Sequence, residues 1–511
     1  MNKTYLNSRT VVILAFVLSF LLPQSHPAAY AQRIQPYSYQ FYQKLNRVQY
    51  SWDTRQHTAV KPMILDSLTN SVHDSLMQIG YRERSTWAGR KIWNEHLLEV
   101  EEDDFYFYAD FLPDFQIGRD FASGGKTTWL NSRGFQAGGS VMNRFFFYTS
   151  GYENQGVFPE YVDEFINTNR VVPGQMYGKI GKETQDWTYV SAILAYKPSE
   201  ALTFSLAYDK NFIGDGYRSM LLSDISSNST SFKFNGTFSD INVTSIWSYM
   251  LDPREARNED FRRSRSQRKY GAFQYVDWNV SNRFSLGIFH SLIWANRLAD
   301  RTLVNADEEP IGDVATGDGA SSTMQVGLNS KFKALPNATV YGQILLNREM
   351  AAQLGIRGFD ALGIKNLNFL AEFNYAQPYA YTSDDPLSNY SNYGQPLAHP
   401  FGANFNELVG ILNYSYQKFD FSLQGNYGHY GSRGKNIFIA AGSTMDQAVP
   451  ELTSNLLFAD ARVAYLINPK YNLRLEAGTS LRRETNDVQT RSSGMITLGL
   501  RASFRNLYYD F

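Results

Sequence analysis

The chain has 511 residues, of which 48 are Lys or Arg and 49 are Asp or Glu, so its formal net charge is −1. It contains no cysteine, which excludes disulfides, thiolate nucleophiles and cysteine zinc sites. Beyond the N-terminus no run approaches the roughly 18 apolar residues of a membrane-spanning helix, and the balanced charge is unlike that of nucleic-acid-binding proteins, so both classes are excluded.

Residues 1–31 have the organisation of a cleaved signal peptide. Lys3 and Arg9 form a basic start, residues 11–22 are apolar, and Ala29-Tyr30-Ala31 provides small residues before a cleavage site at Gln32. The apolar stretch is too short to span a bilayer, so a retained anchor is the weaker interpretation. We therefore expect an exported mature protein.

Residues 32–102 are predicted to form a helical domain that acts as a periplasmic cap, plug or docking module. One amphipathic helix is indicated by apolar residues at three- and four-residue steps: Met63, Ile64, Leu65, Leu68, Val72 and Leu76. A second helix over residues 90–100 would place Trp93, Leu97 and Val100 on one face. The histidines of this domain have no metal-ligand spacing within one helix and are predicted to be structural: His57, His73 and His96.

After residue 104 the apolar period changes from 3.6 to 2, which indicates β-strands. Between Leu473 and Arg482, apolar residues alternate with polar ones that include Arg474 and Glu476. The same alternation occurs in residues 202–209, 367–375 and 419–428. The apolar faces are rich in aromatics, as expected for strands that face lipid. The inward charges could line a pore or pair with one another.

Short and long connections between these strands alternate along most of the chain. Short turns include residues 198–200 and 468–470. The long polar excursions cover about 153–186, 211–229, 252–268, 295–321, 378–403 and 431–454. A short exception is expected near residues 347–350. Tight turns on one side and long loops on the other are typical of outer-membrane barrels.

We therefore predict an all-β fold, a transmembrane outer-membrane β-barrel of about 18 antiparallel strands, over residues 103–511 with long extracellular loops. The expected strands cover residues 105–118, 127–141, 143–152, 187–197, 201–210, 230–238, 241–251, 269–280, 282–294, 322–333, 338–348, 350–359, 366–377, 404–416, 419–430, 455–467, 471–484 and 491–504. A secreted array of β-sandwiches is the alternative. Such a barrel is wide enough for a channel unless its lumen is filled, and residues 36–100 and the long loops are candidates for that plug.

An even strand count would place both ends of the barrel on the periplasmic side. The chain closes with the aromatic segment 507–511, which ends in Phe511. A terminal aromatic residue is what the insertion machinery of outer membranes generally recognises, so we expect this segment to serve that purpose.

Signals for catalysis are weak. Residues 123–127 resemble the end of a phosphate-binding loop, but Asp120 stands where the first glycine is required. His290 and His429 lie on predicted strands without a nucleophile signature such as G-x-S-x-G. We predict no enzyme activity, no cofactor and no bound metal.

The loop over residues 252–269 has the strongest charge feature, with seven basic and four acidic residues. Its basic residues are Arg254, Arg257, Arg262, Arg263, Arg265, Arg268 and Lys269. Guanidinium groups bind carboxylates and phosphates with bidentate geometry, so these arginines are candidates for holding an acidic polymer. A solvated loop that faces lipopolysaccharide is the alternative.

The loop over residues 378–403 sets several tyrosines among Pro386, Pro396 and Pro400. Tyr390 and Tyr393 are candidates for stacking on sugar faces. A self-packed loop that folds into the barrel mouth is the alternative. In the earlier loop after the third strand, Tyr161 and Phe165 indicate one short structural helix.

Several motifs between the N-terminal domain and residue 405 are similar to those of a known family. They are Phe111–Arg119, Gly151–Gly156, Gly214–Asp224, Gly363–Leu367 and Tyr393–Pro400. In combination they resemble the Wzi-type capsule-assembly barrels of outer membranes, and most closely the RemB-like gliding-motility branch from Bacteroidetes. The resemblance implies an 18-stranded barrel closed by a periplasmic helical bundle. It also implies a lectin-like surface role with capsular or exported polysaccharide, and in the gliding branch a role in motility.

Within the Gly214–Asp224 motif, Tyr217 and Arg218 are candidates for direct sugar contact. The alternative is an inward-folded constriction loop in which Arg218 pairs with Asp215 or Asp224. Met220 departs from the family pattern, which has a second leucine there.

Three functions remain open. A barrel that binds and organises polysaccharide at the cell surface is favoured, with polysaccharide and outer-membrane lipid as partners. A porin-like channel for small solutes would need an open lumen. A scaffold of a motility or secretion machine would dock other envelope proteins instead of sugars.

Overall fold

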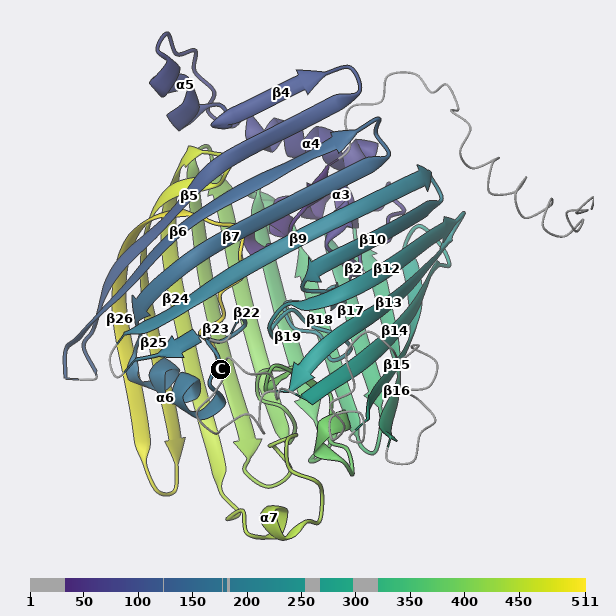
Figure 1. Cartoon of the computed structure of the whole chain (residues 1–511), viewed down its shortest axis with the longest axis vertical. Helices are drawn as coiled ribbons and strands as arrows, with labels where there is room; N and C mark the ends of the chain where they lie inside the picture. The colour runs from purple at the N-terminus through teal and green to yellow at the C-terminus, as the bar shows by residue number, and fades with distance from the viewer. Residues whose placement is uncertain (1–32, 123, 177, 182–183, 253–266, 297–319) are drawn as a thin grey trace, which may run out of the picture.

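The computed structural model describes residues 33–511 except 123, 177, 182–183, 253–266 and 297–319 (Figure 1). The predicted signal peptide lies outside the described residues. The described chain forms one closed antiparallel barrel with short elements inside it and at its ends. No helix in these residues is long and apolar enough to cross a membrane.

The barrel wall consists, within the described residues, of 18 long strands, and β26 pairs with β5 to close it. The strands are β5 (Phe105–Asp120), β6 (Lys126–Val141), β7 (Phe145–Val157), β9 (Gln185–Ser199), β10 (Leu202–Asp209), β12 (Ser229–Phe238), β13 (Ile241–Asp252), β14 (Gln267–Asn279), β15 (Phe284–Asn296), β16 (Ala320–Leu335), β17 (Ala338–Leu346), β18 (Met350–Gly358), β19 (Leu367–Ala376), β22 (Phe405–Tyr416), β23 (Phe419–Gly431), β24 (Thr453–Asn468), β25 (Leu473–Asn486) and β26 (Thr490–Ala502). Each overlaps a strand expected from the alternation, so the predicted barrel is confirmed.

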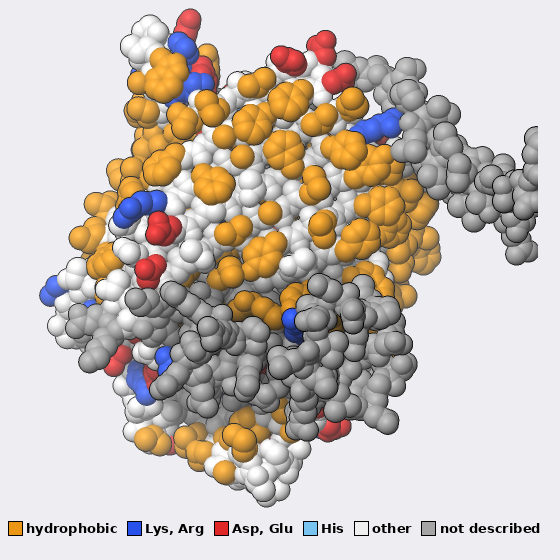
Figure 2. Space-filling view, viewed as in Figure 1, with side chains coloured by type: hydrophobic (Ala, Val, Ile, Leu, Met, Phe, Trp, Pro, Cys, Tyr) orange, Lys and Arg blue, Asp and Glu red, His pale blue; other side chains and the backbone are white. Residues whose placement is uncertain are grey.

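Side chains alternate between the outside and the lumen along these strands. On β25, Leu475 and Leu481 are 49% and 62% exposed on the outer face, whereas Arg474 and Glu476 are buried inside. Figure 2 shows hydrophobic side chains across the strand face with few charged ones among them. An apolar outer band over a polar interior is the pattern of a membrane-spanning barrel.

The connections sort into two ends of the barrel. The short-turn end comprises residues 142–144, 200–201, 239–240, 280–283, 336–337, 359–366, 417–418 and 469–472. At the opposite, long-loop end the connections include 158–184, 210–228, 377–404 and 432–452. Three connections at this end are also short, over 121–125, 347–349 and 487–489. The sequence predicts only the one at 347–349 as an exception to the alternation of loop lengths.

The long loops carry the remaining small elements. These are α6 (Glu160–Asn169), β8 (Gly178–Ile180), β11 (Phe212–Ile213), η3 (Pro386–Ser388), β20 (Ser391–Asn392), β21 (Gln395–Pro396) and α7 (Thr444–Gln447), and at the short-turn end η2 (Ala361–Gly363). Helix α6 confirms the short helix expected around Tyr161 and Phe165.

The N-terminal segment up to residue 97 is built from short pieces instead of two long helices. Its elements are β1 (Ile34–Gln35), α2 (Tyr39–Gln43), α3 (Asn46–Tyr50), β2 (Val60–Lys61), β3 (Met63–Ile64), α4 (Ser67–Met77) and α5 (Trp87–Trp93). Helix α4 begins directly after Asp66, whose side chain accepts a hydrogen bond from the Thr69 backbone N–H and caps the helix. Met63 and Ile64 therefore lie in a strand that pairs with β1, a correction to the predicted helix.

The second predicted helix is also shorter than expected. Helix α5 ends at Trp93, and Val100 lies in β4 (Leu98–Glu102), which pairs with β5 beside the barrel wall. Leu98 and Val100 are two residues apart, as on one face of a strand. Leu97 and Val100 are three residues apart, which also fits a helix, so the spacing alone does not distinguish the two. The expected boundary at residue 102 thus falls inside a hairpin.

The last residues do not end on the wall. Strand β26 ends at Ala502, and residues 503–511 turn back into the lumen, where the C-terminus lies in Figure 1. The ring of Phe511 packs against Phe165 of α6, with 4.8 Å between ring centroids. This inward tail corrects the expected strand to residue 504 and places Phe511 away from the strand end.

Candidate functional site

The lumen is filled by four segments of the chain: the N-terminal segment, the inward loop 210–228, the tyrosine loop 377–404 and the tail 503–511. The N-terminal segment is held by cations that point inward from the wall. Lys331 Nζ donates to Thr58 Oγ1 at 2.6 Å, Lys333 Nζ donates to the Ser51 carbonyl at 2.6 Å, and Arg357 donates to the Tyr50 hydroxyl at 3.0 Å. Such charge-assisted bonds are the stronger kind, so the wall holds this segment inside the lumen.

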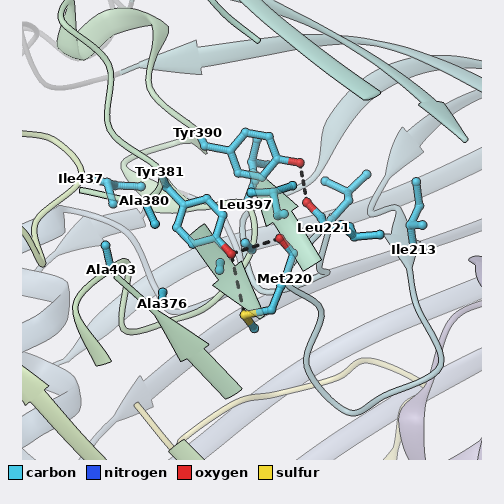
Figure 3. Packing of buried hydrophobic residues seen from close by; sticks show 14 of the residues in the cluster. Ile213, Met220, Leu221, Ala376, Ala380, Tyr381, Tyr390, Leu397, Ala403 and Ile437 are labelled. Atoms are coloured by element: carbon cyan, nitrogen blue, oxygen red, sulfur yellow. Dashed lines mark hydrogen bonds between the residues drawn. The ribbon is translucent and has the colours of Figure 1, made fainter. Parts of the chain in front are cut away.

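The inward loop and the tyrosine loop meet in an apolar cluster in the lumen (Figure 3). Met220 and Leu221 are fully buried there. The Tyr381 hydroxyl donates to the Met220 carbonyl at 3.0 Å, and the Tyr390 hydroxyl donates to the Leu221 carbonyl at 2.5 Å. Tyr390 is 1% exposed. Its ring packs in this cluster and its hydroxyl is hydrogen-bonded within the protein. This arrangement is the self-packed loop that the sequence offered as the alternative.

Arg218 is the centre of a buried charge network between three segments. Its guanidinium donates to Glu407 of β22 at 3.1 Å and to Asp510 of the tail at 2.9 Å. His399 of the tyrosine loop lies 2.7 Å from the same Glu407 carboxylate. Arg218 has no exposed surface. The network joins the inward loop to the wall, the tail and the tyrosine loop.

The expected pairing of Arg218 with Asp215 or Asp224 is wrong, because both carboxylates have other partners. Asp215 accepts hydrogen bonds from Tyr50 at 2.8 Å and Thr58 at 2.5 Å, both in the N-terminal segment. Asp224 accepts from Asn506 at 2.7 Å and from Tyr508 in the tail. The inward loop is therefore held by other segments of the chain.

The acidic Asp215 compensates buried cations where the plug meets the inward loop. Burial alone would raise the pKa of Asp215, but Lys331 and Lys61 with the hydrogen bonds from Thr58 and Tyr50 hold that pKa well below its usual range. Burial lowers the pKa of Lys61 to about 7. Strand β2, which contains Lys61, pairs with β11 of the inward loop. The two segments thus form one continuous filling.

Glycine is required at the turn that places Tyr217 and Arg218. The backbone N–H groups of both residues donate to the Glu372 carboxylate, at 2.9 and 3.1 Å. A Cβ atom on Gly216 would lie 2.2 Å from Glu372 Oε2. Only glycine allows this approach, which gives the Gly-Asp-Gly-Tyr-Arg motif a structural purpose.

The candidate sugar-binding residues are therefore not brought together. Tyr217, Arg218 and Tyr390 are buried in the lumen. Tyr393 is half-buried near the wall, where its N–H donates to the Leu251 carbonyl at 2.8 Å. Arg268 is exposed on β14. The other candidates lie outside the described residues: Arg254, Arg257, Arg262, Arg263 and Arg265.

The partners of Arg218 were missed by the sequence reasoning. Glu407 and Glu372 occupy inward positions of their strands, and an acidic residue at an inward position is a signal that period-2 analysis can find. Asp510 has no such signal, because the tail follows no regular pattern. The inward wall charges pair as one alternative proposed: Arg474 lies 2.8 Å from Glu476, which also binds Arg501.

The histidines have structural partners or face outward. His57 lies 2.7 Å from Asp277 and His96 lies 2.6 Å from Asp110, whereas His73 packs against Phe41. On the wall, His429 is exposed on the outer face next to Asn455. No group of three potential metal-ligating side chains is found among the described residues.

Fold and lumen together define a class: an 18-stranded barrel with an apolar outer surface whose interior is filled by its own N-terminal segment, loops and tail. No protein-family model matches the sequence, and no curated protein matches it. The fold is similar to the solved structure of Wzi, an outer membrane protein of Escherichia coli involved in group 1 capsule assembly and described as a carbohydrate-binding β-barrel. The TM-score is 0.56 and the identity 13%, over 93% of this chain and 100% of that chain. OprD of Pseudomonas aeruginosa matches with a TM-score of 0.42 and 7% identity, over 77% of this chain and 94% of that one.

Proposed function

We propose that this protein is an outer-membrane barrel that binds and organises exported or capsular polysaccharide at the cell surface. The observation that carries the proposal is an 18-stranded barrel of the Wzi fold, matched over almost the whole chain, with a lumen that is filled. The proposal includes export by a signal peptide over residues 1–31, a periplasmic plug over 32–102 and a barrel over 103–511. The proposal also includes that this polysaccharide binding serves gliding motility, as the resemblance to the RemB-like branch implies.

The packed lumen argues against the porin-like alternative. A conducting channel needs a continuous polar path, and the inward and tyrosine loops instead meet in buried side chains such as Met220, Leu221 and Tyr390. A docking scaffold remains the second candidate function. Its support is the α5–β4 projection, where Trp87 and Leu98 are 61% and 59% exposed.

Sugar recognition is proposed to reside in the basic loop 252–269. Tyr217, Arg218 and Tyr390 are buried and hydrogen-bonded inside the lumen, which leaves the loop arginines as the candidates for an acidic polymer. Arg268, at the described edge of this loop, is exposed.

Deletion of the gene is expected to raise shed polysaccharide and lower cell-bound polysaccharide while total synthesis stays constant. Complementation with Arg262, Arg263 and Arg265 changed to Ser should fail to restore the bound fraction, because the loop loses three guanidinium groups. The matched control changes Arg82, Arg84 and Arg90 to Ser in the N-terminal segment and should restore it. Unchanged fractions in the deletion strain would refute the attachment role, and a gliding assay would then test the scaffold.

A further inference from the structure

A cavity of about 370 Å³ lies between the N-terminal segment and the inward faces of β9 to β14. Its volume falls within the range of about 300–1,000 Å³ that small-molecule sites occupy. Its rim includes exposed residues at the short-turn end, such as Glu200 and Ser239, and its interior includes the buried Ser205 and Lys233. The cavity is therefore open toward the short-turn end, away from the long loops.

The cavity has one apolar side and one polar side. Val60, Pro62 and Ile64 of the N-terminal segment provide apolar surface. The facing strands β10, β12 and β13 provide hydroxyl and amide groups: Thr203, Ser205, Asn235, Thr237 and Asn242. A sugar ring has the same division, with C–H faces and a rim of hydroxyls.

Several of these polar groups are not used by the protein. Among the described residues, the hydroxyls of Thr203 and Ser205 have no hydrogen-bond partner, although both line the cavity. The Oδ1 atom of Asn235 accepts a hydrogen bond from the Thr244 hydroxyl at 2.6 Å. The N–H₂ group of Asn235 can therefore donate to a ligand. Donors and acceptors of this kind are what a ligand hydroxyl would satisfy.

Lys233 is the cation of this cavity that lacks a close carboxylate. Its Nζ has two long contacts of 3.4 Å, with the Pro62 carbonyl and Asn211 Oδ1. Asp209 acts on it electrostatically, but no carboxylate of the described residues lies within 4.0 Å of Lys233. A buried ammonium without a close anion favours an incoming one.

The other cations of the cavity are already paired. Arg55 lies 3.0 Å from Asp240, Lys197 is paired with Glu200, and His57 lies 2.7 Å from Asp277. The rim charges therefore compensate one another, and the positive charge available to a ligand is the buried one at Lys233.

We propose that this cavity binds a carboxylate-bearing saccharide of one or two rings, with the carboxylate on Lys233 and the sugar hydroxyls on Thr203, Ser205 and Asn235. The ligand enters from the short-turn end, so this site is separate from the loop arginines proposed for surface attachment. It gives the barrel an acidic-sugar site on the side where the plug lies.

The test uses the purified full-length barrel in detergent and measures calorimetric binding of digalacturonate and of its dimethyl ester. The two ligands have the same rings and differ in charge, so the acid is expected to bind and the ester to bind at least about tenfold more weakly, the value of one charge-assisted contact. Equal affinity for acid and ester, or no binding of either, would overturn the proposal.

Two variants locate the site. Lys233→Gln should weaken digalacturonate binding about tenfold or more, whereas Lys44→Gln, which removes a lysine paired with Asp420 outside the cavity, should leave it unchanged. Ser205→Leu keeps Lys233 but replaces a lining hydroxyl with a larger apolar side chain that projects into the cavity, so it should weaken binding about tenfold or more even if Lys233→Gln folds poorly. Wild-type affinity in Ser205→Leu would exclude this cavity. The result is independent of polysaccharide shedding, so the two proposals can fail separately.

Discussion

Replacing Arg218 with Met is expected to lower the free energy of unfolding of the barrel by about 3–5 kcal/mol, the cost of removing one partner from a buried ion pair. The variant leaves the carboxylates of Glu407 and Asp510 buried without their cation. Both lie within hydrogen-bond distance of the guanidinium in the native protein. The loss is large because no water can replace the guanidinium at a side chain with no exposed surface.

Urea unfolding of the purified protein in detergent, followed by tryptophan fluorescence, measures this change. Arg268→Met is the control, because it removes an exposed arginine from the outer part of β14 and should shift the midpoint little. A triple variant that combines Arg218→Met with Glu407→Gln and Asp510→Asn should recover much of the stability, since it removes the unpaired charges as well. A loss below about 1 kcal/mol in Arg218→Met would mean that the network is not what holds the inward loop.

The barrel itself could be predicted because apolar and polar residues alternate several times along each strand. On β25 the alternate residues Leu475, Thr479 and Leu481 are exposed on the outer face, and a shift of one residue would turn Arg474 and Glu476 outward. The cost of such a shift fixes both the strand and its register. Alternation of loop lengths adds a second, independent signal for the topology.

The segments that fill the lumen could be predicted only in outline, because their sequences have no regular alternation of apolar and polar residues. In the N-terminal segment the helices are shorter than the apolar spacing predicts, because the spacing of Met63 and Val100 fits a strand as well as a helix. The partners of Arg218 lie 189 and 292 residues away in the chain. Long-range contacts of this kind leave no local pattern, so the ion pair was assigned to the nearer Asp215 and Asp224.

Removing one barrier from the lumen is expected to leave the barrel non-conducting, whereas removing two should open it. The first barrier is the N-terminal plug, anchored on Lys331, Lys333 and Arg357. The second is the apolar cluster around Met220 and Leu221 of the inward loop. The two segments contact each other, but the cluster is also held by Tyr381 and Tyr390 of the tyrosine loop and the plug by cations of the wall. Each should therefore block ions without the other.

Planar-bilayer recordings would compare the wild type with three variants. One deletes residues 36–97, one replaces residues 212–226 with a short Gly-Ser linker, and one combines both changes. The wild type and each single variant should show no steady conductance, and the double variant should conduct, because an emptied barrel of 18 strands leaves an aqueous channel. Steady conductance after deleting the plug alone would show that the apolar cluster is not a seal.

The double variant also tests how the two loops depend on each other. Without residues 212–226, Tyr381 and Tyr390 lose the Met220 and Leu221 carbonyls to which their hydroxyls donate. Buried hydroxyls without acceptors are costly, so the tyrosine loop should leave the lumen instead of collapsing into the space. A silent double variant would mean that the tyrosine loop and the tail seal the barrel by themselves. A conducting one would show that closure is a property of this chain's inward loop and plug, added to a wall that could serve as a pore.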